Sequence, residues 1–210
     1  MPKRRDALQA YRLKRDPRRT PEPSSSGRRR RRAPTGEPRF VIQKHDATTL
    51  HYDVRLEAAG VLKSWAVPQG PSTDPREKRL AMPTEDHPLD YADFEGVIPE
   101  GQYGAGPVIV WDTGPYRNLT ERDGRPVPVE EAVEQGHVTV WLEGKKLRGG
   151  YAFTRTGSGG GTGGGGRQKW LLVKMKDESA DARRNPVRTQ PESVLSGRRI
   201  EDLATEREAS

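Results

Sequence analysis

The sequence lacks cysteine altogether and has no long apolar run. Without a thiol, the chain can form no disulfide and can use neither a cysteine nucleophile nor a cysteine-based zinc site. No window approaches the 18 consecutive apolar residues of a membrane span, and no apolar stretch follows the basic N-terminus as it would in a signal peptide. These absences predict a cytoplasmic protein that does not enter a membrane.

Apolar side chains are scarce as well. Only 31% of the 210 residues are hydrophobic and 6% are aromatic, the mean hydropathy is −0.95, and there are 23 glycines and 18 prolines. This composition is too polar for the whole chain to share one core, and the chain is too short for two ordinary domains. We therefore expect one compact domain with polar segments at its ends.

The net charge of +7 is concentrated near the N-terminus. Residues 1–32 carry 13 basic and 3 acidic side chains, whereas the remainder carries 24 and 27. Five consecutive arginines, 28–32, lie in a Pro- and Ser-rich linker that can bury no apolar surface. The arm predicts a polyanionic partner, nucleic acid first and an anionic membrane second, or else a nonspecific solubilising tether. The expected organisation is a basic arm and linker over 1–38, the domain over 39–177, and a polar flexible tail over 178–210.

The sequence pattern of the domain is typical of a mainly β protein. Short β-like runs separated by turn residues predict an antiparallel barrel or sandwich of about eight strands. The expected strands are 40–42, 50–56, 61–67, 79–82, 107–111, 137–142, 151–154 and 170–175. One internal helix is expected over 129–135, between Pro128 and Gly136, and short flanking helices are expected over 6–15 and 200–204. The glycine run 157–166 is expected to be a flexible loop between the last two strands.

One predicted strand, 50–57, carries most of the chemical information. Because side chains alternate along a strand, one face presents Leu50, Tyr52, Val54 and Leu56 to a core. The other face lines up His51, Asp53 and Arg55 at intervals of about 7 Å, and His45 could approach them across a turn. Two imidazoles and a carboxylate suit Mn, Fe, Co, Ni or Zn, and an arginine fork fits phosphate oxygens. The alternative is an ordinary edge strand with a solvated polar face.

A second group of polar side chains follows in residues 84–91. Glu85, His87 and Tyr91 lie in a loop-like stretch whose backbone is restricted by Pro88. A histidine held on such a loop can protonate a leaving oxygen or bind a phosphate oxygen. The metal and the arginine expected on strand 50–57 are what phosphoryl transfer needs, for neutralising charge and orienting the phosphorus.

Other conspicuous residues have simpler explanations. His137 has no charged companions and is expected at the surface or in a structural role. The segment 99–107 is expected to be a glycine-rich turn, although it could shape a substrate groove. The four tryptophans, Trp65, Trp111, Trp141 and Trp170, all fall in predicted strands, so core packing is expected for them rather than base stacking.

These motifs together resemble the 3′-phosphoesterase domain of bacterial DNA ligase D over about residues 6–177. The segments that carry the resemblance are 43–57 (QKHDATTLHYDVRLE), 62–68 (LKSWAVP), 78–81 (KRLA), 85–91 (EDHPLDY) and 94–101 (FEGVIPEG). The resemblance implies a compact β-barrel enzyme, usually manganese-dependent, that acts in DNA double-strand break repair by non-homologous end joining. Such an enzyme removes a 3′-terminal ribonucleoside and then the 3′-phosphate, leaving a 3′-hydroxyl. No polymerase or ligase domain accompanies the match, so we expect a stand-alone version.

The resemblance also implies roles for individual residues. The metal ligands would be His45, His51 and Asp53. Arg55, Arg79 and His87 would contact the scissile phosphate, with His87 also the candidate acid, and Glu85 and Tyr91 would complete the site. In the arm, Arg15, Asp16 and Glu22 match residues that support the ribonuclease step.

Two positions depart from the family pattern. Gln69 stands where a lysine is common, and Pro17 stands where an aromatic residue is usual. The lost cation would weaken contacts to phosphate or ribose, and Pro17 would loosen docking of the arm, so the phosphomonoesterase prediction is stronger than the diesterase one.

The expected partners are DNA 3′ ends at primer–template junctions, with Ku and a separate DNA ligase or polymerase as candidates. The protein is expected to be a nucleoid-associated monomer. The alternative function is a noncatalytic DNA-end-binding adaptor of a repair complex, in which the arm dominates and the site is degenerate.

Overall fold

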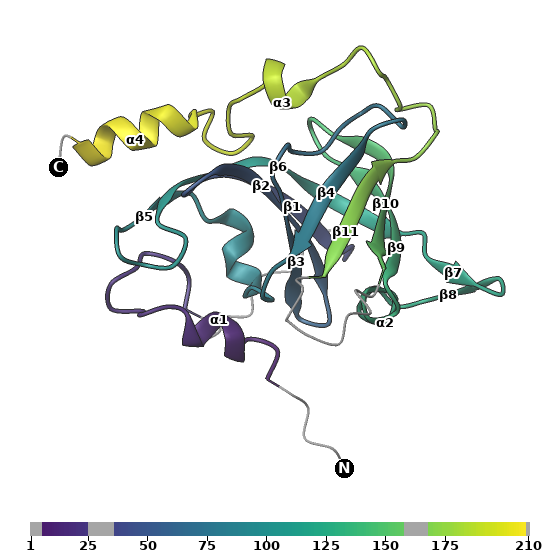
Figure 1. The fold of residues 1–210 in the computed structure, drawn as a ribbon, viewed down its shortest axis with the longest axis horizontal. Helices are drawn as coiled ribbons and strands as arrows, with labels where there is room; N and C mark the ends of the chain where they lie inside the picture. Colours follow the sequence, from purple (N-terminus) through teal and green to yellow (C-terminus); the bar gives the residue numbers. More distant parts are fainter. Residues whose placement is uncertain (1–5, 25–35, 158–167, 209–210) are drawn as a thin grey trace.

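A computed structural model describes residues 6–24, 36–157 and 168–208 (Figure 1). Eight antiparallel strands form a closed ring in the order β1-β2-β3-β4-β11-β10-β9-β6, because β6 pairs with β1 as well as with β9. The ring strands are β1 (Arg39–Asp46), β2 (Leu50–Ala58), β3 (Val61–Val67), β4 (Lys78–Pro83), β6 (Gly106–Asn118), β9 (His137–Glu143), β10 (Arg148–Thr156) and β11 (Lys169–Lys174). The predicted eight-stranded antiparallel barrel is confirmed.

The barrel interior holds the main core. Its largest fully buried side chains include Trp65, Trp111 and Trp170, together with Tyr116 and Phe153. The prediction that all four tryptophans pack in the core is wrong for Trp141, which is only half-buried. Its indole lies 5.5 Å from the guanidinium of Arg117, so a cation on the neighbouring strand covers a ring that points outward.

The helix predicted between Pro128 and Gly136 is present as α2 (Val129–Gln135), and Gly136 ends it in the left-handed conformation, at φ 91°. The two flanking helices are also present, with different bounds. They are α1 (Gln9–Leu13) and α4 (Ile200–Glu208). The remaining elements were not predicted from the sequence: η1 (Leu89–Asp93), α3 (Pro186–Thr189), β5 (Gly96–Ile98) on the edge of β6, and the small hairpin β7 (Glu121–Arg122) with β8 (Arg125–Pro126).

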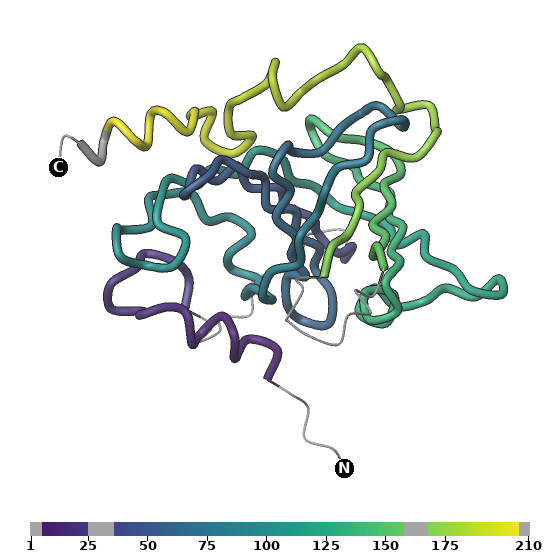
Figure 2. Tube along the Cα trace, viewed as in Figure 1, coloured from purple at the N-terminus to yellow at the C-terminus, as the bar shows by residue number. Residues whose placement is uncertain are grey.

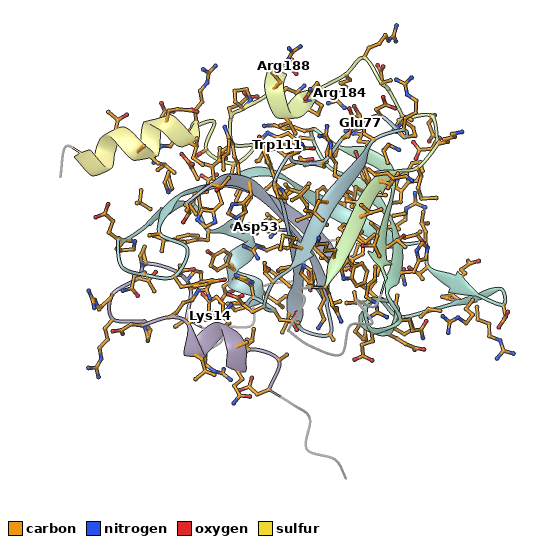
Figure 3. All side chains as sticks on the ribbon, viewed as in Figure 1. Lys14, Asp53, Glu77, Trp111, Arg184 and Arg188 are labelled. Carbon is orange, nitrogen blue, oxygen red and sulfur yellow. The ribbon has the colours of Figure 1, made fainter. Side chains whose placement is uncertain are left out.

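The C-terminal segment contacts the barrel along residues 181–203. The Thr73 hydroxyl lies within hydrogen-bonding distance of the Asp181 and Arg184 carbonyls, and Trp111 Nε1 donates to the Gln190 carbonyl at 2.7 Å. Ile200 and Leu203 of α4 pack against Ile109 of β6. The chain trace shows this segment crossing the side of the barrel away from α1 (Figure 2). Arg184 and Arg188 accordingly lie far from Lys14 in Figure 3. These contacts lie beyond residue 177, where the sequence analysis places the end of the domain.

Some sequence predictions concern residues outside the described ones. The arginine run 28–32 and nearly all of the glycine run 157–166 belong to this group. None of the helices in the described part of the chain has the length and apolar character needed to cross a bilayer.

Candidate active site

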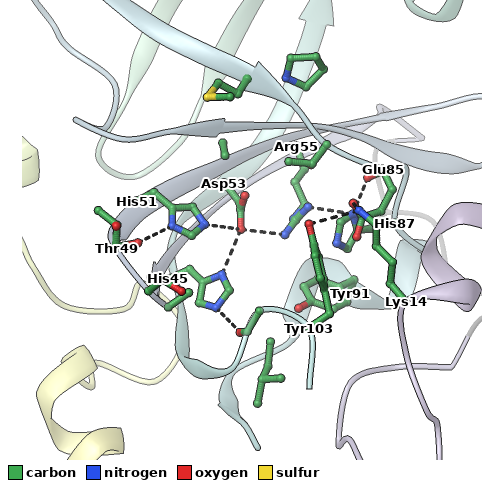
Figure 4. Close-up of a pocket in the computed structure, with 18 of the residues that line it drawn as sticks. Lys14, His45, Thr49, His51, Asp53, Arg55, Glu85, His87, Tyr91 and Tyr103 are labelled. Atoms are coloured by element: carbon green, nitrogen blue, oxygen red, sulfur yellow. Dashed lines mark hydrogen bonds and ion pairs between the residues drawn. The ribbon is translucent and has the colours of Figure 1, made fainter. Parts of the chain in front are cut away.

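The β1–β2 hairpin brings the three predicted metal ligands together. Its antiparallel register places His45 opposite His51 and Gln43 opposite Asp53. Asp53 Oδ2 lies 3.6 Å from His45 Nδ1 and 3.7 Å from His51 Nε2, and one ligand atom from each of the three residues lies within 4.8 Å of the others. The side chains point toward one another in Figure 4. The expected approach of His45 across the turn is therefore confirmed.

Backbone carbonyl groups fix the orientation of both imidazoles. His45 Nε2 lies 2.8 Å from the Gly104 carbonyl oxygen, and His51 Nδ1 lies 2.8 Å from that of Thr49. A carbonyl can only accept, so these ring nitrogens carry the protons. His45 Nδ1 and His51 Nε2 are therefore the nitrogens that face Asp53 and that would bind a metal, and a hydrogen bond on the other ring nitrogen is how protein metal sites orient their imidazoles.

The polar face of β2 is buried. Asp53 is 5% exposed and Arg55 is 2% exposed, so the alternative of a solvated edge strand is wrong. Arg55 Nη2 donates to Asp53 Oδ2 at 3.1 Å, and Arg55 Nε donates to Gln43 Oε1 at 2.8 Å. Burial alone would raise the pKa of Asp53, but the Arg55 charge and the two histidines outweigh it and hold that pKa well below its usual range. Asp53 is thus an anion available to a cation.

His87 occupies the opposite end of this polar row. Its backbone pairs with Leu62, which makes an isolated bridge to the sheet. Its Nδ1 lies 2.8 Å from the Glu85 carbonyl and 3.0 Å from Arg55 Nη1. Burial and the neighbouring cations of Arg55 and Arg15 lower the pKa of His87 well below its usual range. The imidazole is therefore neutral at physiological pH.

The N-terminal arm closes one side of the site. Arg15 Nε donates to Glu22 Oε1 at 2.8 Å, Nη1 donates to Glu85 Oε1 at 2.9 Å, and Nη2 lies 3.3 Å from His87 Nε2. Tyr91 in turn donates its hydroxyl to Glu22 Oε1 at 2.9 Å. Burial raises the pKa of Glu85, but Lys14 and Arg15 outweigh burial and lower it overall. Arg15, Glu22, Glu85 and Tyr91 thus form one hydrogen-bonded network beside His87.

These groups line a cavity of about 680 Å³. It contains seven of the predicted residues in the body, namely His45, His51, Asp53, Arg55, Glu85, His87 and Tyr91, together with Arg15 from the arm. Glu22 lies behind the lining, held by Arg15 and Tyr91.

Two predicted site residues lie elsewhere. Arg79 is outside the lining and donates to Gln69 Oε1 at 2.8 Å, with Glu77 as its ion-pair partner. Asp16 is exposed, and its carboxylate accepts from the Arg18 backbone N–H at 3.0 Å. The exposed His137 bonds to Thr154, far along the sequence from every lining residue.

Several contributors were not predicted from the sequence. Gln43 is fully buried and donates to the carbonyls of Tyr91 and Phe94 at 3.0 Å, which ties η1 to β1. It lies two residues before His45, so strand alternation could have found it. Tyr11 also joins the site, because its ring packs edge-on against His87 at 5.2 Å. Nothing in the local sequence pattern of the arm indicates that contact.

A comparison with protein-family models matches residues 43–155, more than half of the chain, to the DNA ligase D 3′-phosphoesterase domain. The chain belongs to the DNA ligase D 3′-phosphoesterase family. The matched residues run from Gln43 to Arg155 and include all the cavity-lining polar residues of β1, β2 and η1.

Relatives of this DNA ligase D family member are longer proteins. The chain is 50% identical over 195 residues to the multifunctional non-homologous end joining protein LigD of Pseudomonas aeruginosa, covering 92% of this chain and 22% of that protein. It is 42% identical over 179 residues to LigD of Mycobacterium tuberculosis and 41% identical over 175 residues to LigD of Mycolicibacterium smegmatis, covering 82% of this chain in both cases and 20% and 21% of those proteins. The chain thus spans about a fifth of the length of these relatives.

Proposed function

We propose that the protein is a metal-dependent phosphoesterase that heals DNA 3′ ends. It would remove a 3′-phosphate and a 3′-terminal ribonucleoside and leave a 3′-hydroxyl that a ligase can use. The observation that supports this proposal is the convergence of His45, His51 and Asp53 with Arg55 and His87 in one cavity, within a domain of the DNA ligase D 3′-phosphoesterase family.

The donor set fits a divalent transition metal. Two imidazole lone pairs and one ionised carboxylate face the same point, and each imidazole is oriented by a carbonyl on its other nitrogen. Such ligands suit manganese, iron or zinc, and we propose manganese on the family resemblance. When bound, the metal supplies Lewis acidity that polarises a phosphoryl oxygen.

Arg55 is the residue best placed to hold the phosphate. Its Nε and Nη2 are engaged by Gln43 and Asp53, while Nη1 points toward His87. The guanidinium is therefore held rigidly between the metal ligands and His87, and a phosphoryl group entering the cavity would meet it there. A fixed cation offsets the charge that builds up on the phosphoryl oxygens as water attacks the phosphorus.

His87 would deliver a proton to the leaving oxygen. In the free protein it is neutral, because burial and the Arg55 and Arg15 cations disfavour its charged form. A bound phosphate carries negative charge into the space between those cations and so raises the proton affinity of His87. Protonation would thus be coupled to substrate binding, as a general acid requires.

The DNA partner is part of the same proposal. Beyond residue 24, basic side chains of the arm strongly outnumber acidic ones in the sequence. This positive charge favours binding to a polyanion such as DNA. Action at broken chromosomes would make the protein nucleoid-associated, with Ku and a separate ligase or polymerase as candidate partners.

The test is a primer–template whose primer ends in a 3′-phosphate, incubated with Mn²⁺ and the wild-type protein, His51→Ala, His87→Ala or His137→Ala. We expect the wild type and His137→Ala to yield a 3′-hydroxyl that a polymerase can extend, and His51→Ala and His87→Ala to lose at least about 100-fold in rate. His137 is the matched control because it is an exposed histidine outside the cavity. Binding of the DNA without turnover by the wild type would support the adaptor function instead. Equal activity in all four proteins would show that His51 and His87 do not carry the reaction.

A further inference from the structure

We propose that Tyr103 is a nucleobase-binding residue that stacks on the base of the terminal nucleotide. This inference rests on the proposed function, because it concerns the substrate of the same cavity. It assigns a role to the glycine-rich turn 99–107, which the sequence analysis singles out and which the metal and phosphate sites do not explain.

Tyr103 differs from the other tyrosines in its exposure. It is 50% exposed, whereas the remaining five are at most 3% exposed. Those five are Tyr11, Tyr52, Tyr91, Tyr116 and Tyr151. The tryptophans and phenylalanines are buried or half-buried. The ring of Tyr103 is therefore accessible from solvent, and it lines the cavity.

The turn holds Tyr103 in a fixed place relative to the metal ligands. Backbone bonds from Gln102 N to the Pro99 carbonyl and from Ala105 N to the Gln102 carbonyl, each 3.2 Å, close the turn. The next residue, Gly104, takes a positive φ of 76° and presents its carbonyl to His45. The exposed ring of Tyr103 and the Gly104 carbonyl that orients His45 therefore belong to adjacent residues.

Two cationic side chains lie next to the Tyr103 ring. Lys14 Nζ lies 4.3 Å from the ring centroid and 3.2 Å from the hydroxyl, and the Arg15 guanidinium carbon lies 5.6 Å from the centroid. Arg15 also reaches His87, at 3.3 Å. Arg15 thus contacts both Tyr103 and His87. Figure 4 shows Lys14, Tyr103 and His87 on the same side of the site.

This arrangement suits a nucleotide whose phosphate is held by Arg55 inside the cavity. The base of that nucleotide must project from the cavity, and a planar ring at the mouth offers it a stacking surface. Aromatic side chains bind single-stranded or frayed ends in this way without preference for one base, and neighbouring cations contact the backbone. If Tyr103 only positioned Lys14, replacing it would change the activity on substrates with and without a terminal base equally.

The experiment uses two primer–templates with a 3′-phosphate that differ only at the primer end, which carries either a natural nucleotide or its tetrahydrofuran abasic analogue. The quantity measured is the ratio of kcat/KM for the natural end to kcat/KM for the abasic end. We expect Tyr103→Leu to lower this ratio about ten-fold relative to the wild type. Tyr103→Phe keeps the ring and loses only the hydroxyl, so it should keep the wild-type ratio.

Three results distinguish the hypotheses. An unchanged ratio in Tyr103→Leu would overturn the role of Tyr103, whether or not both activities fall together. An equal loss on both substrates with weakened Mn²⁺ binding would show that the substitution moved Gly104, and would overturn it too. Failure of the wild type to release phosphate from either substrate would overturn the proposed function itself.

Discussion

Arg15 Nη1 lies 2.9 Å from Glu85 Oε1, and this ion pair joins the N-terminal arm to the wall of the cavity. Both side chains are buried, with 7% and 4% of their surfaces exposed. The same guanidinium holds Glu22, which is fully buried. The arm is thus a structural part of the site, and Arg15 is the side chain that pairs with both carboxylates.

Arg15→Ala is expected to release the arm while the barrel stays folded. The substitution leaves Glu22 buried without its cation and leaves Glu85 with Lys14 alone. Removing one partner of a buried ion pair costs about 3–5 kcal/mol where the structure cannot relax, and the arm can relax by undocking. Hydrogen–deuterium exchange should therefore speed up at least ten-fold in residues 9–13 and stay unchanged in β6. Arg19→Ala, an exposed arginine of the same arm, should show neither effect. Equal protection of α1 in all three proteins would show that the ion pair does not hold the arm.

Gly104→Ala is expected to weaken metal binding more than Gly101→Ala. Both glycines have a left-handed φ, 76° and 77°, so either substitution costs about 1–2 kcal/mol of backbone strain. Only at Gly104 would the new Cβ meet His45, at 3.3 Å from its Cε1, because nothing lies within 4 Å of a Cβ at Gly101. Calorimetry should show Mn²⁺ affinity about 10- to 100-fold lower for Gly104→Ala and near the wild-type value for Gly101→Ala. The same affinity in both variants would rule out the Gly104 carbonyl as a determinant of the His45 orientation.

The depressed pKa of His87 predicts a specific loss of stability in acid. An unfolded histidine titrates near pH 6.5, as a rough reference value, and the folded pKa lies well below its usual range. As the pH falls below that value, the unfolded state binds the proton first. The free energy of unfolding should then decrease by up to about 1.4 kcal/mol per pH unit until the folded pKa is reached.

His87→Gln removes this titration and should flatten the profile. Urea denaturation of the wild type and His87→Gln at pH values from about 7.5 to about 5 measures how the free energy of unfolding of each protein changes with pH. The wild type should lose more stability than the variant across that range. Parallel profiles would mean that His87 is not held neutral in the folded protein.

The barrel strands could be predicted because each is a short apolar or β-branched run bounded by glycine, proline or acidic turn residues. The strand pattern alone did not distinguish a barrel from a sandwich, because closure depends on β1 pairing with β6 some 70 residues later. The family resemblance is what implied a barrel. β5 has three residues and β7 and β8 have two each, too few for a pattern. Trp141 was misjudged because a strand position alone does not tell which face of the sheet is covered.

The metal ligands and Arg55 could be predicted, because side chains alternate along β2 and because one turn brings His45 back toward them. The sequence did not predict that this polar face would be buried, because the elements that cover it, η1 and the arm, come from distant parts of the chain. Arg15 and Glu85 are 70 residues apart. The group that orients His45 is a backbone carbonyl, and its identity depends only on how the glycine-rich turn folds.

Gln69→Lys is expected to strengthen binding of a 3′-phosphate end. Gln69 is exposed, follows the cavity-lining Pro68 and is bonded to Arg79. A lysine there adds a cation at the edge of the site, which is the residue that the family resemblance leads us to expect. KM for phosphate-terminated DNA should fall about three- to ten-fold at low salt, and the gain should shrink as salt screens the added charge. Gln69→Met keeps the length without the charge, and an equal KM in the two variants would show that position 69 does not sense the phosphate.

The central claim is that one divalent cation, bound by His45, His51 and Asp53, is required for release of the 3′-phosphate. The most direct measurement titrates Mn²⁺ into chelator-treated protein while metal binding and phosphate release are followed in the same samples. We predict that one equivalent binds, that release rises in proportion to occupancy, and that His45→Ala loses both. Release at full rate without metal, or Mn²⁺ binding that is unchanged in His45→Ala, would contradict the account.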